Sequence, residues 1–301
     1  MKPVLMIFID GVGIGEKNYE INPFFKYGFR IFDELFKDTP YSQNLFLEKN
    51  GMYVFPTDAK LGVEGLPQSG TGQVSIFCGI NAPKFVGKHF GPFPYSTTIP
   101  IIEEKNIFRT FKELGKSAYF ANAYPKVFFD YLRSGKTRLS TTSLSCRLAG
   151  IKLNSVTELR QSKALTAEIT NERWNRKLKY QLKVISPETA ARRLLRIAGK
   201  NDFTLYEFFH TDHLGHGRLT EEFESIYDNL NRFLFTILKE LNKNDMTLIM
   251  CSDHGNFEDL SVKTHTINPA LTITAGYQAA QLAGSIKDLT DIKPSIIKYC
   301  T

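Results

Sequence analysis

The chain has 301 residues, of which 42% are hydrophobic and 23% charged, and its formal net charge is +7 at pH 7. This composition is ordinary for a globular protein and excludes disordered and fibrous classes. The four scattered cysteines argue against a disulfide framework or a cysteine-based zinc site. No apolar run approaches the ~18 residues that span a bilayer, so we expect a cytoplasmic protein without a membrane partner.

The first part of the chain alternates short apolar runs with helical patterns. Val4–Ile9 predicts a buried strand, because an unbroken apolar run ends directly at Asp10. Asn22–Phe36 has phenylalanines at helical spacing and predicts one helix. The other elements expected here are a loop or short strand at Val54–Gly65, helices at Gly70–Cys78 and Ile107–Leu114, and a strand at Ser117–Ala123.

The last third of the chain continues this alternation. Ser186 and Pro187 form a typical helix start, with a polar cap before proline at the first helical position, and the helix Ala190–Ala198 follows. The remaining elements are strands at Phe203–Phe209, Met246–Cys251 and Ala270–Thr274 and helices at Glu221–Leu241 and Asp291–Tyr299. Strands separated by helices predict an α/β fold, a mainly parallel doubly wound sheet with helices on both faces.

One segment departs from this pattern. Residues 126–183 carry 13 Lys and Arg against 4 Asp and Glu, a net charge of +9 that leaves the rest of the chain close to −2. The segment shows no strand alternation. We therefore predict a core made of residues 1–124 and 184–301 and a short basic cap inserted at residues 125–183. Such a segment attracts anions, although a merely solvated basic face would have the same composition.

Three of the predicted strands run into an aspartate, namely Asp10, Asp212 and Asp253. In open α/β sheets, ligands bind beyond the carboxyl ends of the strands. Three carboxylates gathered at that edge would repel one another and raise each other's pKa unless a cation neutralised them. The pattern therefore indicates a metal site.

Histidines near these aspartates support the same interpretation. His216 follows Asp212 by four residues, the spacing that places two side chains on one side of a helical turn. His254 directly follows Asp253, and His265 lies eleven residues further on. Sets of carboxylates and imidazoles suit zinc, manganese or iron, whereas calcium prefers oxygen ligands only.

A glycine-rich turn, Ser69-Gly70-Thr71-Gly72, precedes a predicted helix. A helix N-terminus favours a phosphate group, and a serine hydroxyl there becomes a competent nucleophile when a metal lowers its pKa. Thr71 is a second candidate nucleophile on the same turn. A loop that only reverses the chain would also be rich in glycine.

Together these segments resemble the alkaline-phosphatase superfamily of two-metal enzymes, and in particular cofactor-independent phosphoglycerate mutase and phosphopentomutase. The resemblance rests on Phe8–Gly13, Ser69–Gln73, Asp212–His216, Ser252–Asn256 and Lys263–Pro269. It implies two divalent metal ions, for which zinc or manganese fit better than magnesium. It also implies that Ser69 is the catalytic nucleophile and becomes phosphorylated. The implied ligands are Asp10, Ser69, Asp253 and His254 for one metal and Asp212, His216 and His265 for the other.

The sequence also departs from the mutases. Gln73 stands where their nucleophile motif usually carries histidine, the segment between Ser69 and Asp212 is too short for their large inserted domain, and no Arg-Asp-Arg motif is present. A mutase must shield its phosphoenzyme from water, whereas a hydrolase must admit water. We therefore predict a phosphatase or phosphodiesterase acting on a small phosphorylated substrate, with a phosphomutase as the alternative. Lys263 or an arginine of residues 126–183 would contact the phosphate.

Two other functions fit the sequence less well. Sulfatases of this superfamily use a formylglycine made from the Cys or Ser of a Cys/Ser-x-Pro-x-Arg sequence, and no such sequence surrounds Ser69. A non-enzymatic nucleic-acid-binding protein would use the basic segment, but aromatic residues are sparse there and no known binding motif appears, which argues against a nucleic-acid partner. The sequence predicts no oligomeric state.

Overall fold

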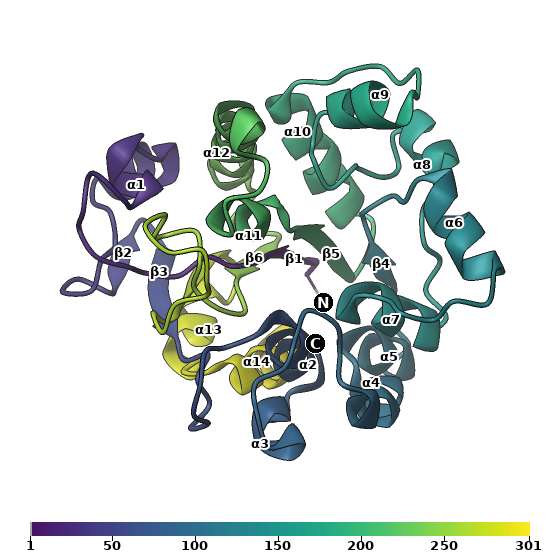
Figure 1. The fold of residues 1–301 in the computed structure, drawn as a ribbon, viewed down its shortest axis with the longest axis horizontal. Helices are drawn as coiled ribbons and strands as arrows, with labels where there is room; N and C mark the ends of the chain where they lie inside the picture. Colours follow the sequence, from purple (N-terminus) through teal and green to yellow (C-terminus); the bar gives the residue numbers. More distant parts are fainter. Residues whose placement is uncertain (1) are drawn as a thin grey trace.

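The computed structural model describes residues 2–301, which form a seven-stranded sheet covered by helices (Figure 1). The strand order is β2-β3-β7-β6-β1-β5-β4. Strands β6, β1, β5 and β4 are parallel to one another. On the other side of β6, β7 is antiparallel to β6, β3 is antiparallel to β7, and β2 is antiparallel to β3. The predicted α/β class, with a mainly parallel core, is confirmed. The strands are β1 Val4–Ile9, β2 Leu47–Lys49, β3 Met52–Thr57, β4 Ala118–Phe120, β5 Phe203–Phe208, β6 Thr247–Cys251 and β7 Ala270–Gly276.

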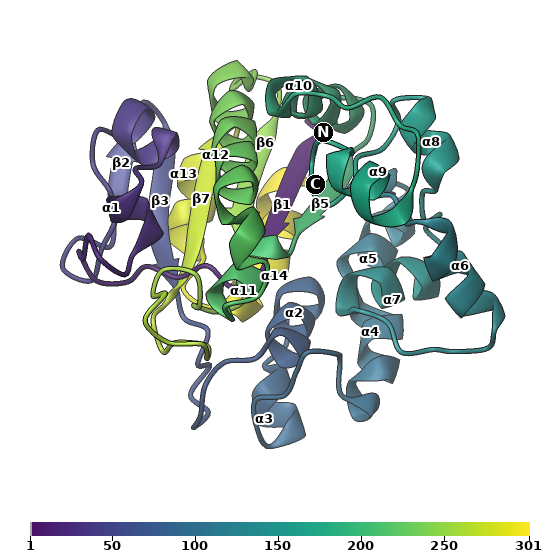
Figure 2. The same ribbon diagram turned by 45° about the horizontal axis from the view of Figure 1, so that its top comes forward.

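Helices cover both faces of the sheet (Figure 2). Successive side chains of the buried strands point to opposite sides, so each face carries apolar residues for the helices to cover. In β1, Leu5 and Ile7 belong to a hydrophobic core with α10 (Pro187–Ala198) and α12 (Phe223–Glu240). The alternate residues of β1 join a second core on the other face. The helices of that face are α2 Ser69–Cys78, α5 Ile107–Glu113, α13 Ala279–Ser285 and α14 Ile292–Cys300.

The helix predicted at residues 22–36 is the clearest correction. The structure has two separate turns, α1 (Pro23–Lys26) and η1 (Ile31–Phe36), so the prediction of one helix was wrong. Gly28 lies between them with φ +70°, a left-handed conformation that ends a helix. Elements that the sequence analysis missed are β2, α13, α3 Ala82–Val86, η2 Ser96–Thr98, α4 Ile99–Lys105, η3 Thr220–Glu222 and η4 Leu289–Asp291.

The basic segment is helical and lies beside the β4 edge of the sheet (Figure 1). Its helices are α6 Lys126–Arg133, α7 Thr141–Leu148, α8 Val156–Arg160 and α9 Glu172–Leu178. α7 packs against α4 and α5 of the core. In the later part of the segment, a small hydrophobic cluster that includes Leu159, Trp174 and Leu182 packs its helices together. The division into a core and a cap stays a prediction. None of the helices within residues 2–301 is both long and apolar enough to cross a membrane.

Candidate metal centre

The carboxyl ends of three neighbouring parallel strands bring the three predicted aspartates together. Asp10 follows β1, Asp253 follows β6, and Asp212 lies in α11 (His210–Gly215), which starts just after β5. β1 lies between β6 and β5 in the sheet. Gly11, with φ +70°, turns the chain away from β1, and its N–H lies 3.3 Å from Asp253 Oδ1. The topology therefore explains how residues more than 200 positions apart form one site.

One cluster contains Asp10, Ser69, Asp253 and His254. His254 Nε2 lies 3.2 Å from Asp10 Oδ1 and 3.6 Å from Asp253 Oδ1. Ser69 Oγ lies 3.0 Å from the same Nε2 atom and 3.5 Å from Asp10 Oδ1. All four side chains are buried. The structure thus brings together the four residues predicted to hold one metal.

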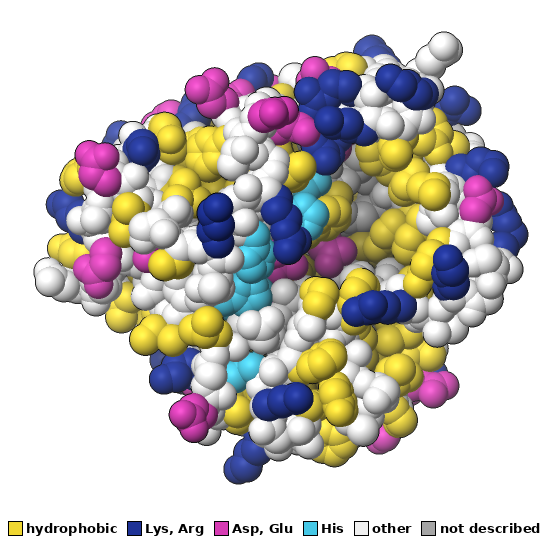
Figure 3. All heavy atoms as spheres, in the orientation of Figure 1, with side chains coloured by type: hydrophobic (Ala, Val, Ile, Leu, Met, Phe, Trp, Pro, Cys, Tyr) yellow, Lys and Arg dark blue, Asp and Glu magenta, His cyan; other side chains and the backbone are white. Residues whose placement is uncertain are grey.

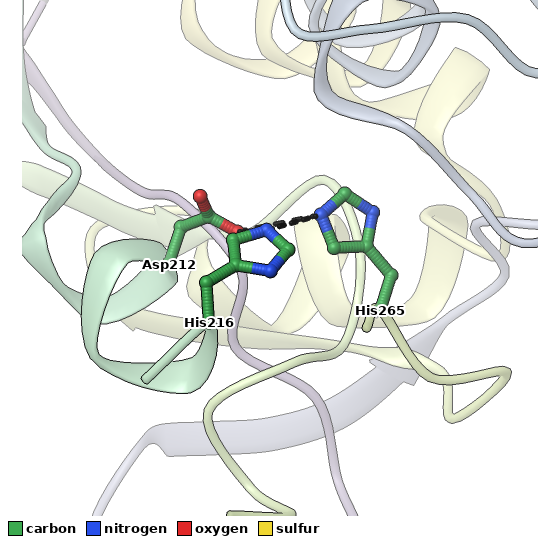
Figure 4. A group of neighbouring side chains, drawn as sticks. All are labelled: Asp212, His216 and His265. Atoms are coloured by element: carbon green, nitrogen blue, oxygen red, sulfur yellow. Dashed lines mark hydrogen bonds and ion pairs between the residues drawn. The ribbon is translucent and has the colours of Figure 1, made fainter. Parts of the chain in front are cut away.

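The second cluster contains Asp212, His216 and His265, whose imidazoles point toward the Asp212 carboxylate (Figure 4). His216 Nε2 lies 3.2 Å and His265 Nε2 3.4 Å from Asp212 Oδ1, and the two nitrogens are 3.1 Å apart. The His265 ring also stacks on the His254 ring with centroids 3.7 Å apart, so the two clusters adjoin.

Backbone carbonyls orient the two imidazoles of the second cluster. His216 Nδ1 lies 2.7 Å from the carbonyl oxygen of Lys263, and His265 Nδ1 lies 2.6 Å from that of Pro67. An Nδ1–H that donates to a carbonyl leaves the Nε2 lone pair of a neutral imidazole free for a metal. Asn256 Nδ2 donates to Asp212 Oδ1 at 2.8 Å and fixes the carboxylate in the same way.

The charges of the site suit divalent cations. Within residues 2–301 no Lys or Arg forms an ion pair with Asp10, Asp212 or Asp253. Burial, and then the carboxylates of Asp253 and Asp212, raise the pKa of Asp10 well above its ordinary value. Burial also acts to raise the pKa of Asp212, but hydrogen bonding to His265 and the charge of His254 outweigh it, and the net pKa is lowered; a metal bound by these imidazoles would supply that positive charge in place of their protons. Converging carboxylates and lone pairs of this kind need a cation for stability, so the donor set fits metal ions.

The glycine-rich turn places Ser69 at the start of α2. A Cβ on Gly70 would lie only 2.1 Å from the carbonyl oxygen of Phe93, so the close approach of that loop requires glycine. The Thr71 hydroxyl lies 3.3 Å from the carbonyl oxygen of Gln68 and 3.4 Å from that of Phe90 and points into the turn. Ser69, and not Thr71, lines the cavity beside the aspartates.

Two polar residues that the sequence analysis did not assign to the site support its ligands. Gln73 Nε2 lies 3.4 Å from Asp10 Oδ2 and 3.4 Å from Asp253 Oδ2. Glu258 is 1% exposed and accepts hydrogen bonds from Gly13, Asn256 and Thr266, which follow Asp10, His254 and His265 in the chain. Its only sequence signal is its place five residues after Asp253.

A cavity of about 710 Å³ opens beside Asp10, Ser69 and Asp212. Figure 3 shows it as a hollow with histidines and acidic side chains on one side and a largely hydrophobic wall opposite. Arg138 and Arg218 line it, whereas Lys263 contributes its carbonyl oxygen to His216 instead.

Glu207 also lies in this cavity and was missed because it interrupts an apolar strand pattern. Its Oε1 accepts a hydrogen bond from Thr142 at 2.7 Å. Burial raises the pKa of Glu207 to about 7. A buried carboxyl therefore adjoins the cluster that contains Asp10.

Comparison with known proteins agrees with this architecture. The model of the metalloenzyme superfamily matches residues 2–301, and the chain belongs to this superfamily of alkaline-phosphatase-like enzymes. Membership implies divalent metal ions, and the clusters above offer candidate ligands. No curated protein matches the chain.

Solved structures with the same fold include three from different sources. The PH0037 protein of Pyrococcus horikoshii aligns with a TM-score of 0.57 and 13% identity over 99% of this chain and 96% of that one. A cold-active alkaline phosphatase from Shewanella sp. aligns with a TM-score of 0.52 and 10% identity, over 98% of this chain and 99% of that one. The C-terminal periplasmic domain of EcEptC from Escherichia coli, in complex with zinc, aligns with a TM-score of 0.50 and 11% identity, over 100% of this chain and 83% of that one. At these identities the likeness concerns the fold.

Proposed function

We propose that this metalloenzyme is a two-metal phosphoester hydrolase that works through a phosphoserine at Ser69. The observation that carries the proposal is the position of Ser69 Oγ, 3.0 Å from His254 Nε2 and 3.5 Å from Asp10 Oδ1 at the edge of an open cavity. A serine hydroxyl placed among ligands of this kind is suited to attack an electrophile that enters from the cavity.

Asp10, Ser69, Asp253 and His254 would hold one cation, and Asp212, His216 and His265 the other. When bound, divalent cations supply Lewis-acid chemistry, which lowers the pKa of a nearby hydroxyl and neutralises phosphate charge. The rest is the work of this chain's own residues. Gln73 fixes the carboxylates of Asp10 and Asp253, and Asn256 fixes that of Asp212. Little reorganisation of these groups is therefore needed during the reaction.

The substrate phosphate would meet positive groups from three directions. At the start of α2, the N–H groups of Ser69 and Gly70 have no partner inside the helix, whereas the Thr71 N–H donates to the carbonyl oxygen of Phe90, and the positive end of the helix dipole lies at Ser69. Arg138 and Arg218 line the same cavity, and within residues 2–301 neither forms an ion pair with a carboxylate. Both are therefore free to contact a small phosphorylated substrate.

The reaction would proceed in two displacements. Ser69 Oγ attacks the phosphorus, the bond to the ester oxygen breaks, and the leaving alcohol takes up a proton. Water then attacks the phosphoserine, the Oγ–P bond breaks, and Ser69 regains its proton while inorganic phosphate departs. The short cap of α6 to α9 leaves the cavity open to solvent in Figure 3, which favours hydrolysis over phosphate transfer to a second hydroxyl.

The test compares Ser69→Ala with Thr71→Ala in the metal-loaded protein. Ser69→Ala should lower phosphate release by about three orders of magnitude, whereas Thr71→Ala should retain turnover if the protein stays folded. Acid quenching and mass spectrometry should find phosphate on Ser69, and ¹⁸O from water should enter the released phosphate. Full activity of Ser69→Ala would refute the nucleophile, and an isomerised product without ¹⁸O would indicate the phosphomutase.

A further inference from the structure

The cavity beside the metal centre has an unusually aromatic wall. The aromatic side chains that line it are Phe93, Tyr124, Phe128, Tyr131 and Phe209. Three of the wall residues, Val127, Phe128 and Tyr131, belong to the cap helix α6. A volume of about 710 Å³ is enough for a ligand of nucleotide size.

Helix α6 leaves its apolar side open. None of its residues is buried, and Val127 is 62% exposed. Phe128 stacks on Tyr124 with ring centroids 4.0 Å apart and an interplanar angle of 19°. Apolar surface left in water is unfavourable, so a ligand that covers this wall gains affinity by removing it from solvent.

The polar groups on this wall are already engaged. The Ser140 and Ser143 hydroxyls lie 2.9 Å apart and bond each other, and the Tyr131 hydroxyl donates to the carbonyl oxygen of Arg138 at 3.1 Å. The Arg138 guanidinium lies 4.3 Å from the centre of the Phe93 ring. The wall therefore offers ring faces and positive charge, but few free partners for the hydroxyls of a sugar.

We infer that the site selects phosphoesters whose leaving group carries a planar aromatic ring, seated against Phe128 and Tyr131 while the phosphate lies at Ser69. The inference rests on the proposed hydrolase function and adds its substrate class. A nucleoside or a simple aryl group would present the same ring chemistry to this wall.

The test uses pairs of substrates that differ by one ring. Benzyl phosphate and ethyl phosphate both release a primary alcohol, as do AMP and ribose 5-phosphate, so the leaving oxygen is matched within each pair. We expect a KM about tenfold lower for benzyl phosphate than for ethyl phosphate. The same preference for AMP over ribose 5-phosphate would indicate that the preferred leaving group is a nucleoside. If AMP is not preferred, the preferred leaving group is a simple aryl group.

Variants of α6 locate the ring. Phe128→Ala and the milder Phe128→Leu should abolish the benzyl preference and leave KM for ethyl phosphate unchanged. Phe129→Ala is the matched control, because Phe129 packs edge-on against Phe128 with ring centroids 5.7 Å apart but lines a different hollow with Arg133 and Lys152. It measures the effect of lost packing on Phe128 without removal of the ring wall, and the benzyl preference should persist. Thermal melting of each variant shows whether the fold is intact.

Binding keeps the two proposals separable. Calorimetry of benzylphosphonate with metal-loaded Ser69→Ala should show binding that weakens about tenfold when Phe128→Leu is added. If no phosphoester is turned over but this binding is seen, the hydrolase proposal fails and the ring site stands. Equal KM values for benzyl and ethyl phosphate, or benzylphosphonate binding that Phe128→Leu does not change, would overturn the inference.

Discussion

Removing the buried carboxylate of Glu258 should both destabilise the protein and loosen its metal site. Oε2 accepts the N–H groups of Gly13 and Asn256, each at 2.8 Å. Oε1 accepts the Thr266 hydroxyl at 2.5 Å and Asn268 Nδ2 at 2.9 Å. The three segments that carry Asp10, His254 and His265 are therefore joined through one side chain.

The expected magnitude follows from these four bonds. Glu258→Ala leaves two buried backbone N–H groups without an acceptor, at about 2 kcal/mol each, so unfolding should become easier by about 4 kcal/mol. Glu258→Gln can keep its oxygen toward the two N–H groups, because the Thr266 hydroxyl and the Asn268 amide can reorient. Its cost should therefore be about half as large.

The assay is urea unfolding combined with metal content after dialysis against a chelator. Metal affinity should fall at least about tenfold in Glu258→Gln, as for other groups that orient metal ligands. Glu103→Ala is the control, because Glu103 is exposed on α4, and it should change stability by less than about 0.5 kcal/mol. If Glu258→Ala matched the control in stability and metal retention, the reasoning would be refuted.

Three further predictions concern separate parts of the fold. Gly70→Ala should lower the free energy of unfolding by about 2 kcal/mol or more, because its Cβ would meet the Phe93 carbonyl oxygen at 2.1 Å; unchanged urea denaturation would contradict this turn geometry. A hydrogen bond from Arg232 lowers the pKa of Glu188 to about 2, so its stabilisation is complete above about pH 4.5 and fades toward pH 2. The difference in unfolding free energy between wild type and Glu188→Gln should shrink over that range, and a constant difference would disprove the coupling. Burial raises the pKa of Cys78 to about 12, and all four cysteines are buried, so a thiol reagent at pH 8 should label the protein only after unfolding.

Local sequence patterns predicted much of the fold and the chemistry of the site. Val4–Ile9 could be identified as a buried strand because an unbroken apolar run needs no distant partner to be recognised. The helix at residues 22–36 failed because periodicity alone does not show where a glycine such as Gly28 takes a left-handed conformation. The antiparallel direction of β7 was equally invisible, because a strand pattern carries no information about its neighbour's direction.

The sequence by itself determined which donor types exist and that they follow strands, because strand ends and ligand spacings are local properties. The family resemblance grouped Asp10 with His254 and named Ser69, but only the tertiary structure shows that Asp10 meets His254 and that Ser69 faces a cavity while Thr71 turns away. The supporting roles of Gln73 and Glu258 could not be predicted from the sequence for the same reason. Their hydrogen-bond partners lie as far as 245 residues away in the chain, and only the packing of the sheet brings those atoms within reach.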